Sequence, residues 1–169
     1  MTTHLLVAQL RFARSEFRRG VDGVSEQEAL RRFERMNCIS WSVGHLASQE
    51  NRLWVLMAQG KSLFPDLVNL VGYGKPASAP SLTEMWAAWR IITAAADTYL
   101  DSLTPALLQT HLIWEGKPRQ EDVGTTLLRN IYHYWFHLGE AYAVRQLLGH
   151  TGLPDFVGNM SAALYRPEE

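Results

Sequence analysis

Three histidines have the types and spacing of a metal site. His133 and His137 stand four residues apart within residues 132–140, so on a helix their side chains share one face, one turn apart. Both imidazoles can then point a ring nitrogen at a single ion. His45, in a separate segment, can supply a third nitrogen from a facing helix. Three protein ligands with an open position are typical of catalytic rather than structural metal sites, so the pattern predicts a bound divalent metal.

Three further polar residues share the faces of these histidines. Glu140 lies one turn beyond His137 and could be a fourth ligand, an acceptor for an imidazole N–H or a general base. Its alternative is a salt bridge on the helix surface. Gln49 and Arg52 share a helical face with His45, which is either solvated or lines the metal cavity. In the second case Arg52 becomes an anion contact, suited to a carboxylate on a substrate or thiol cofactor.

Related metal motifs are absent from the sequence. No Glu follows His133, so the His-Glu-x-x-His motif of metalloproteases is not present. No Glu-x-x-His pair occurs either, which disfavours a di-iron carboxylate bundle. Histidines four residues apart also arise by chance on helices, so ordinary polar packing remains the alternative to metal binding.

Composition restricts the class of protein. The chain of 169 residues is 47% hydrophobic and 20% charged, as expected for one globular domain over residues 1–169. The net charge is −1 and no basic cluster occurs, so we expect neither nucleic-acid nor membrane binding. No apolar run approaches the about 20 residues of a membrane span. The first residues lack a signal pattern and the single cysteine excludes an internal disulfide, so we expect a cytoplasmic protein.

Apolar periodicity and capping signals predict an all-α fold. Long helices are expected over residues 3–19, 40–59, 81–103 and 120–148, with a short helical stretch over 25–33. Prolines and glycines make residues 61–80 a long loop, and 107–114 form a short irregular segment, extended or hairpin-like, before the last helix. The tail from residue 152 is expected on the bundle surface. Together these elements predict a four-helix bundle, whose ligand sites lie between facing helices.

The last helix is apolar on the side opposite the histidines as well. This second stripe consists of Leu127, Ile131, Tyr134, Trp135, Leu138 and Tyr142. If the histidine stripe faces the bundle interior, the second stripe needs its own cover. We expect a symmetric homodimer to provide it, because two-fold pairs are the commonest oligomers. Coverage by the C-terminal tail and residues 61–80 is the alternative.

Two segments resemble the motifs of a known family. Residues 41–54, Trp-Ser-Val-Gly-His-Leu-Ala-Ser-Gln-Glu-Asn-Arg-Leu-Trp, resemble the second-helix motif of DinB-like (damage-inducible) proteins. Residues 130–149 resemble their last-helix signature, in which a His-x-x-x-His pair precedes a Gly, a polar residue and a Leu-Gly ending. Order, separation and helix number agree over essentially the whole chain, which implies the DinB-like four-helix bundle.

The resemblance also implies a function. His45, His133 and His137 would hold one divalent metal, such as Zn, Ni or Fe, with water in the remaining positions. Family members commonly form homodimers, and those of known activity include bacillithiol-, mycothiol- and glutathione-dependent transferases and isomerases. The chain would then be a metal-dependent S-transferase, hydrolase or isomerase acting on a small-molecule substrate with a low-molecular-weight thiol.

One site residue departs from the family pattern. Glu140 occupies a position that often carries Gln in the family. A carboxylate there adds negative charge beside the metal and could serve as a base. A stress-associated bundle that binds a metal or ligand without turnover is therefore the alternative to an enzyme.

Overall fold

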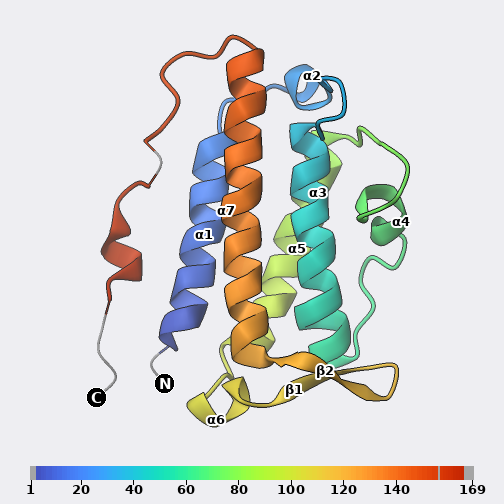
Figure 1. The fold of residues 1–169 in the computed structure, drawn as a ribbon, viewed down its shortest axis with the longest axis vertical. Helices are drawn as coiled ribbons and strands as arrows, with labels where there is room; N and C mark the ends of the chain where they lie inside the picture. Colours follow the sequence, from blue (N-terminus) through green and yellow to red (C-terminus); the bar gives the residue numbers. More distant parts are fainter. Residues whose placement is uncertain (1–2, 156, 166–169) are drawn as a thin grey trace.

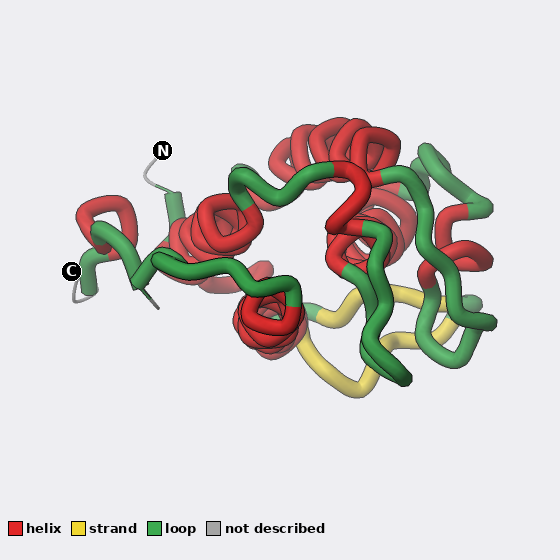
Figure 2. Tube along the Cα trace, turned by 90° about the horizontal axis from the view of Figure 1, so that it is seen from above, coloured by secondary structure: helices red, strands yellow, loops and turns green. Residues whose placement is uncertain are grey.

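Helices make up most of the computed structural model, which describes residues 3–155 and 157–165. In chain order the elements are α1 (Leu5–Val21), α2 (Glu26–Ala29), α3 (Ile39–Glu50), the π-helix η1 (Asn51–Met57), α4 (Leu67–Val71), α5 (Leu82–Leu100), α6 (Pro105–Leu108), β1 (His111–Trp114), β2 (Lys117–Asp122), α7 (Val123–Leu147) and the 3-10 helix η2 (Met160–Ala163). The four long helices α1, α3 with η1, α5 and α7 run along one another (Figure 1) and are seen end on in Figure 2. The predicted all-α four-helix bundle is confirmed. In the described part of the chain no helix is long and apolar enough to span a membrane.

The last helix begins later than its periodicity predicts. Residues 120–122, the start of the predicted helix, belong instead to β2, and α7 starts at Val123. Asp122 caps it, because its side chain accepts a hydrogen bond of 2.7 Å from the backbone N–H of Thr125. The hairpin-like interpretation of the preceding segment holds for His111–Trp114, since β1 and β2 pair antiparallel and Glu115 and Gly116 turn the chain with positive φ. Leu107 and Leu108, expected in the same irregular segment, belong instead to the short helix α6. The hairpin lies across the lower end of α3 and α7 (Figure 1).

The sequence predicts a loop over residues 61–80, but part of this segment is helical in the structure. It contains the short helix α4, which packs against α3 beside the histidine of that helix. Leu67 and Val71 are the buried residues of α4, and their burial stabilises a helix that has no N-terminal side-chain cap. Prolines and glycines surround α4 on both sides, and this composition obscured the one apolar turn.

The predicted helix over 40–59 is correct in extent but not in type. From Asn51 to Met57 its backbone changes to a π-helix. The wider turn frees backbone carbonyls, and the side chain of Gln59 donates to the carbonyl of Trp54 at 2.6 Å. π-helical turns are frequent at functional sites because they change the direction of the side chains that follow. Arg52 lies inside this segment.

The second apolar stripe of α7 packs against α1. Phe12 lies 6.2 Å from Trp135 and Phe17 lies 5.9 Å from Tyr134, measured between ring centroids. The stripe is thus covered within the chain, and the histidine stripe faces α3 at the side of the bundle rather than its centre. The expectation that the second stripe needs another copy was wrong in its premise. The homodimer stays a prediction that rests on the family resemblance.

The C-terminal tail lies along α1, on the side away from α7 (Figure 1). The side chain of Gln9 donates to the carbonyl of Ala163 at 2.8 Å, and the N–H of Gly158 donates to Glu16 at 2.8 Å. The tail therefore covers the bundle surface as expected.

A buried ionic network ties the four long helices together. Arg14 of α1 donates to both carboxylate oxygens of Glu50 on α3, and to Asp97 of α5 at 2.7 Å. Tyr134 of α7 donates to Glu50 at 2.6 Å, and burial holds the pKa of its hydroxyl well above the usual 10.0. Because each helix contributes a partner, a shift of any one leaves a buried charge or hydroxyl unpaired. The network fixes the register of α3 against α7.

Candidate metal centre

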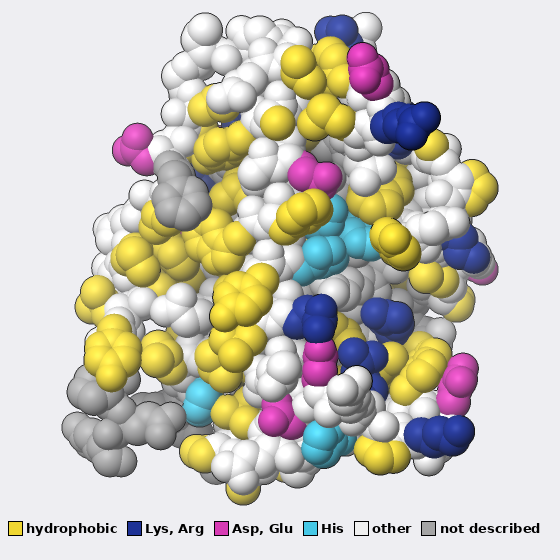
Figure 3. All heavy atoms as spheres, viewed as in Figure 1, with side chains coloured by type: hydrophobic (Ala, Val, Ile, Leu, Met, Phe, Trp, Pro, Cys, Tyr) yellow, Lys and Arg dark blue, Asp and Glu magenta, His cyan; other side chains and the backbone are white. Residues whose placement is uncertain are grey.

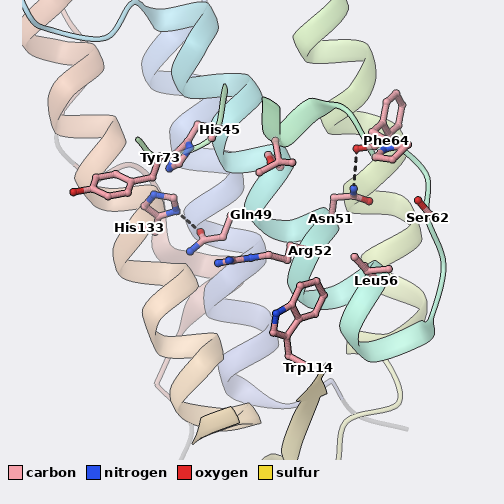
Figure 4. Close-up of a pocket in the computed structure, with 14 residues that line it drawn as sticks. His45, Gln49, Asn51, Arg52, Leu56, Ser62, Phe64, Tyr73, Trp114 and His133 are labelled. Carbon is pink, nitrogen blue, oxygen red and sulfur yellow. Dashed lines mark hydrogen bonds between the residues drawn. The ribbon is translucent and has the colours of Figure 1, made fainter. Parts of the chain in front are cut away.

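The three predicted histidines come together between α3 and α7. Their ligand-type atoms all lie within 4.8 Å of one another. The Nε2 atoms of His133 and His137 are 2.9 Å apart, and the ring of His45 lies 4.9 and 5.2 Å from the other two, centroid to centroid. Figure 4 shows His45 and His133 facing each other, and Figure 3 shows histidine side chains gathered on this face of the molecule. Trp41 stacks on His45 at 4.4 Å and limits its rotation.

Each imidazole is held through its Nδ1 atom by an oxygen. His45 Nδ1 lies 2.8 Å from the backbone carbonyl of Val71. His137 Nδ1 lies 2.6 Å from a carboxylate oxygen of Glu140. His133 Nδ1 makes a close hydrogen bond with the side-chain oxygen of Gln49. Since these oxygens accept, each Nδ1 carries the proton and each Nε2 keeps its lone pair.

The environment keeps His45 and His133 uncharged. Burial lowers the pKa of His45 to about 4, and burial together with the neighbouring imidazoles lowers the pKa of His133 to about 3. At neutral pH both rings are therefore neutral and can act as ligands. The Nε2 lone pairs of His133 and His137, 2.9 Å apart, repel one another, and a shared cation removes that repulsion. Three imidazole nitrogens suit Zn, Ni or Fe, so the donor set fits the expected metal.

A cavity of about 720 Å³ opens beside the histidines. His45 and His133 lie at one end of it, and Arg52 and Trp114 lie toward the hairpin (Figure 4). Its wall is mainly apolar, with Leu56, Phe64, Pro65 and Val68 among the lining residues. The volume is in the range of small-molecule sites, which combine an apolar wall with a few polar groups.

The sequence profile of the DinB superfamily matches residues 9–141. The chain belongs to the DinB superfamily. The match contains all three histidines together with Gln49, Arg52 and Glu140, and it confirms the resemblance seen in the two helix motifs. Among curated proteins no sequence matches the chain.

In this member of the DinB superfamily, Glu140 supports a histidine. Its carboxylate contacts His137 Nδ1, and among the described residues it does not join the group of converging ligand atoms. Of the three roles considered from the sequence, this is the arrangement of an N–H acceptor. The side chain is 31% exposed, so a proton can still reach it from solvent.

Gln49 and Arg52 both line the cavity, which is the second of the two alternatives that their helical face left open. Gln49 also accepts the hydrogen bond from His133, so one residue links the metal cluster to the cavity. Arg52 as a whole residue is exposed, but partial burial of its guanidinium lowers its pKa, and the charge of Arg119 lowers it to a lesser extent. Contact of either residue with a substrate stays a prediction.

Two parts of the site were missed in the sequence. The first is Asn130, whose amide donates to Gln49 at 3.4 Å and accepts from the buried indole of Trp54 at 2.6 Å. Asn130 lies three residues before His133, so helical spacing offered a signal for it. The second is the carbonyl of Val71, a backbone group for which no side-chain pattern could give a signal.

Proposed function

We propose that the chain binds one divalent metal through the Nε2 atoms of His45, His133 and His137, and that it is a thiol-dependent S-transferase or a related hydrolase or isomerase. The observation that carries the proposal is the cluster of imidazoles whose Nδ1 atoms are all held by oxygens. A bound Zn, Ni or Fe ion supplies a Lewis acid that lowers the pKa of a low-molecular-weight thiol and so produces a nucleophile at neutral pH.

The residues around the cluster have separable tasks. Gln49 and Glu140 hold the Nδ1 protons of His133 and His137, which fixes the two rings with Nε2 turned inward. Arg52, on the cavity wall, orients an acidic group of the thiol or substrate. The apolar wall excludes water from the space next to the histidines, which strengthens each electrostatic contact there.

The cavity is the feature that favours an enzyme over a metal store. A closed site would bind metal without turnover, whereas here His45 and His133 line a cavity large enough for a small molecule. A stress-associated protein that holds a metal or ligand without turnover is the second candidate. A cytoplasmic homodimer remains our expectation for the assembly and location.

Metal content is the first test. Protein purified without a polyhistidine tag is compared by elemental analysis with a His133→Ala/His137→Ala variant. A His111→Ala variant, which removes an exposed histidine from β1, serves as the matched control. We expect about one metal per chain in the wild type and in the control, and loss of metal in the double variant. Equal metal content in all three proteins contradicts the proposal.

Activity is the second test. The metal-loaded protein is assayed for conjugation of 1-chloro-2,4-dinitrobenzene with bacillithiol, mycothiol and glutathione, following release of chloride as the carbon–sulfur bond forms. We expect one thiol to react at a rate above that of the double histidine variant. Metal binding without conjugation by any thiol favours the non-catalytic protein instead.

A further inference from the structure

A second hollow lies beside the candidate metal centre, on the exposed face of α7. This groove has a volume of about 470 Å³, and it is lined by Gln49, Thr125, Leu128, Arg129, Tyr132, His133 and Phe136. Every one of these residues except Gln49 belongs to α7. His133 and Gln49 line the larger cavity as well as the groove. The histidine cluster is therefore bordered by two separate spaces.

Two exposed aromatic rings form the wall of the groove. Tyr132 is 64% exposed and Phe136 is 62% exposed, and each directly precedes one of the two histidines of α7. Their spacing of four residues places them on one face of the helix. The ring of Phe136 stands edge-on to that of His137, with 5.1 Å between the ring centroids and an angle of 84° between the planes. Figure 3 shows hydrophobic side chains next to the histidines on this face. An apolar surface open to a ligand thus reaches the cluster itself.

The charge of the groove differs from that of the cavity. Arg129 carries the only permanent charge among the described residues that line the groove. Its Nε atom lies 2.9 Å from both carboxylate oxygens of Glu121, so the protein already neutralises it. The cavity instead contains Arg52, the anion contact proposed above. The groove therefore suits an uncharged ligand, since a charged one would lose hydration there without gaining a free partner.

The extent of the apolar face fits a small molecule. Along α7 it consists of Leu128, Tyr132 and Phe136, and it ends at the polar Thr125 on one side and at Gly139, which has no side chain, on the other. A stable interface between proteins needs about 20–30 residues on each side, far more than this face offers. A volume of about 470 Å³ lies within the range of small-molecule sites.

We propose that this groove is the subsite of a second substrate, an uncharged molecule with an aromatic ring that packs on Tyr132 and Phe136 beside His133. The inference rests on the proposed function, which joins two molecules, a thiol and its partner substrate. The acidic one of the two has its contact at Arg52 in the cavity, and the groove receives the other from the opposite side of His133. The two molecules then meet at the cluster without competing for one space.

An unreactive probe tests the subsite. The probe is 1,3-dinitrobenzene, an uncharged ring without a leaving group, titrated into the zinc-loaded chain labelled with ¹⁵N. Amide signals of residues 125–136 report on the groove, and those of residues 62–73 report on the cavity. We expect saturable shifts over 125–136 and at least about tenfold weaker binding there of 3,5-dinitrobenzoate, whose carboxylate would be desolvated without a partner. Shifts confined to residues 62–73, or no shifts, overturn the proposal.

Variants of exposed residues then locate the ring. Tyr132→Ser/Phe136→Ser should weaken binding of the probe at least about tenfold, because two aromatic contacts are lost. Tyr132→Phe keeps the ring and should bind the probe as the wild type does. Leu147→Ser changes an equally exposed apolar residue of α7 outside the groove, and Tyr73→Ser changes an exposed ring that lines only the cavity. Both should leave the affinity unchanged. An unchanged affinity in Tyr132→Ser/Phe136→Ser contradicts the assignment.

Sedimentation of the same variants tests the other possible occupant. If the wild-type chain is a dimer and Tyr132→Ser/Phe136→Ser is a monomer, a second copy covers the face and the small-molecule subsite is refuted. The inference and the proposed function fail separately. A chain that takes up no zinc yet binds the probe over 125–136 refutes only the proposed function. A chain that binds metal and conjugates a thiol but never holds the probe in the groove refutes only the subsite.

Discussion

Replacing Glu140 gives the sharpest test of how the metal cluster is built. The carboxylate lies 2.6 Å from His137 Nδ1, which is the geometry of a charge-assisted hydrogen bond. The His137 side chain is 4% exposed, so water cannot readily take the place of a lost acceptor. Removing such a supporting group lowers metal affinity by about 10- to 100-fold, or about 1.4 to 2.8 kcal/mol.

Two substitutions separate the charge of Glu140 from its hydrogen bond. Glu140→Leu removes both, and we expect the full loss of affinity. Glu140→Gln keeps an accepting oxygen at the same place, and because neutral hydrogen bonds are about half as strong as charged ones, we expect a loss of only about 3- to 10-fold. Glu84→Gln, on the exposed first turn of α5, is the control and should bind metal as the wild type does.

The affinity is measured by competition with a chromophoric chelator on protein stripped of metal. If Glu140→Leu binds within about twofold of the wild type, the supporting role of the carboxylate is refuted. A loss as large as that of His137→Ala would instead make Glu140 a direct ligand. The ordering wild type, Gln, Leu and finally His137→Ala is the result that agrees with the geometry.

Three further predictions follow from the structure. Metal-free protein should lose stability as pH falls from 6.5 toward 4, because His45 and His133 have pKa values of about 4 and about 3 in the folded protein and the unfolded chain therefore takes up their protons first. In urea unfolding at several pH values, the free energy of unfolding should fall by at most about 2.7 kcal/mol per pH unit. A free energy of unfolding that does not change over this pH range would contradict the prediction. Asn130→Leu should lower the unfolding free energy by about 1–3 kcal/mol and also weaken metal binding, because a buried indole N–H loses its acceptor; unchanged chelator competition would show that Asn130 does not act on the cluster. Gly20→Ala should cost about 1–3 kcal/mol, because its added Cβ would lie 2.7 Å from a ring carbon of Tyr142, and an unchanged thermal midpoint would argue against this close helix contact.

The helices and the histidines could be predicted because their signals are local or periodic. A stripe of apolar residues at helical spacing predicts a helix wherever it packs, and the pair His133 and His137 lies on one face of any helix. The hydrogen-bond partner of each Nδ1 atom has no such local or periodic signal. The carbonyl of Val71 comes from a loop helix whose position depends on packing against α3, and every residue carries a carbonyl. Such contacts follow only from the folded arrangement.

The cover of the second α7 stripe was missed for a related reason. Periodicity indicates that a face is apolar but not which element covers it. Phe12 and Phe17 of α1 supply the cover, and their own stripe was visible in the sequence without a sign of its partner. Residues 120–122 of β2 were assigned to the last helix, because the charged residues of this strand give no period-two signal and its structure depends on pairing with β1.

Three consecutive residues connect the core to the site. Gln49 holds His133, Glu50 binds the buried Arg14, and Asn51 donates to a loop carbonyl at 3.4 Å. A movement of Glu50 would leave the buried charge of Arg14 without its partner. The ion pair therefore fixes the rotation of α3, and with it the direction of Gln49. The π-helix begins at Asn51, and Arg52, its second residue, lines the cavity. We therefore expect a change at Glu50 to reach the histidines through the helix backbone, although its carboxylate touches none of them.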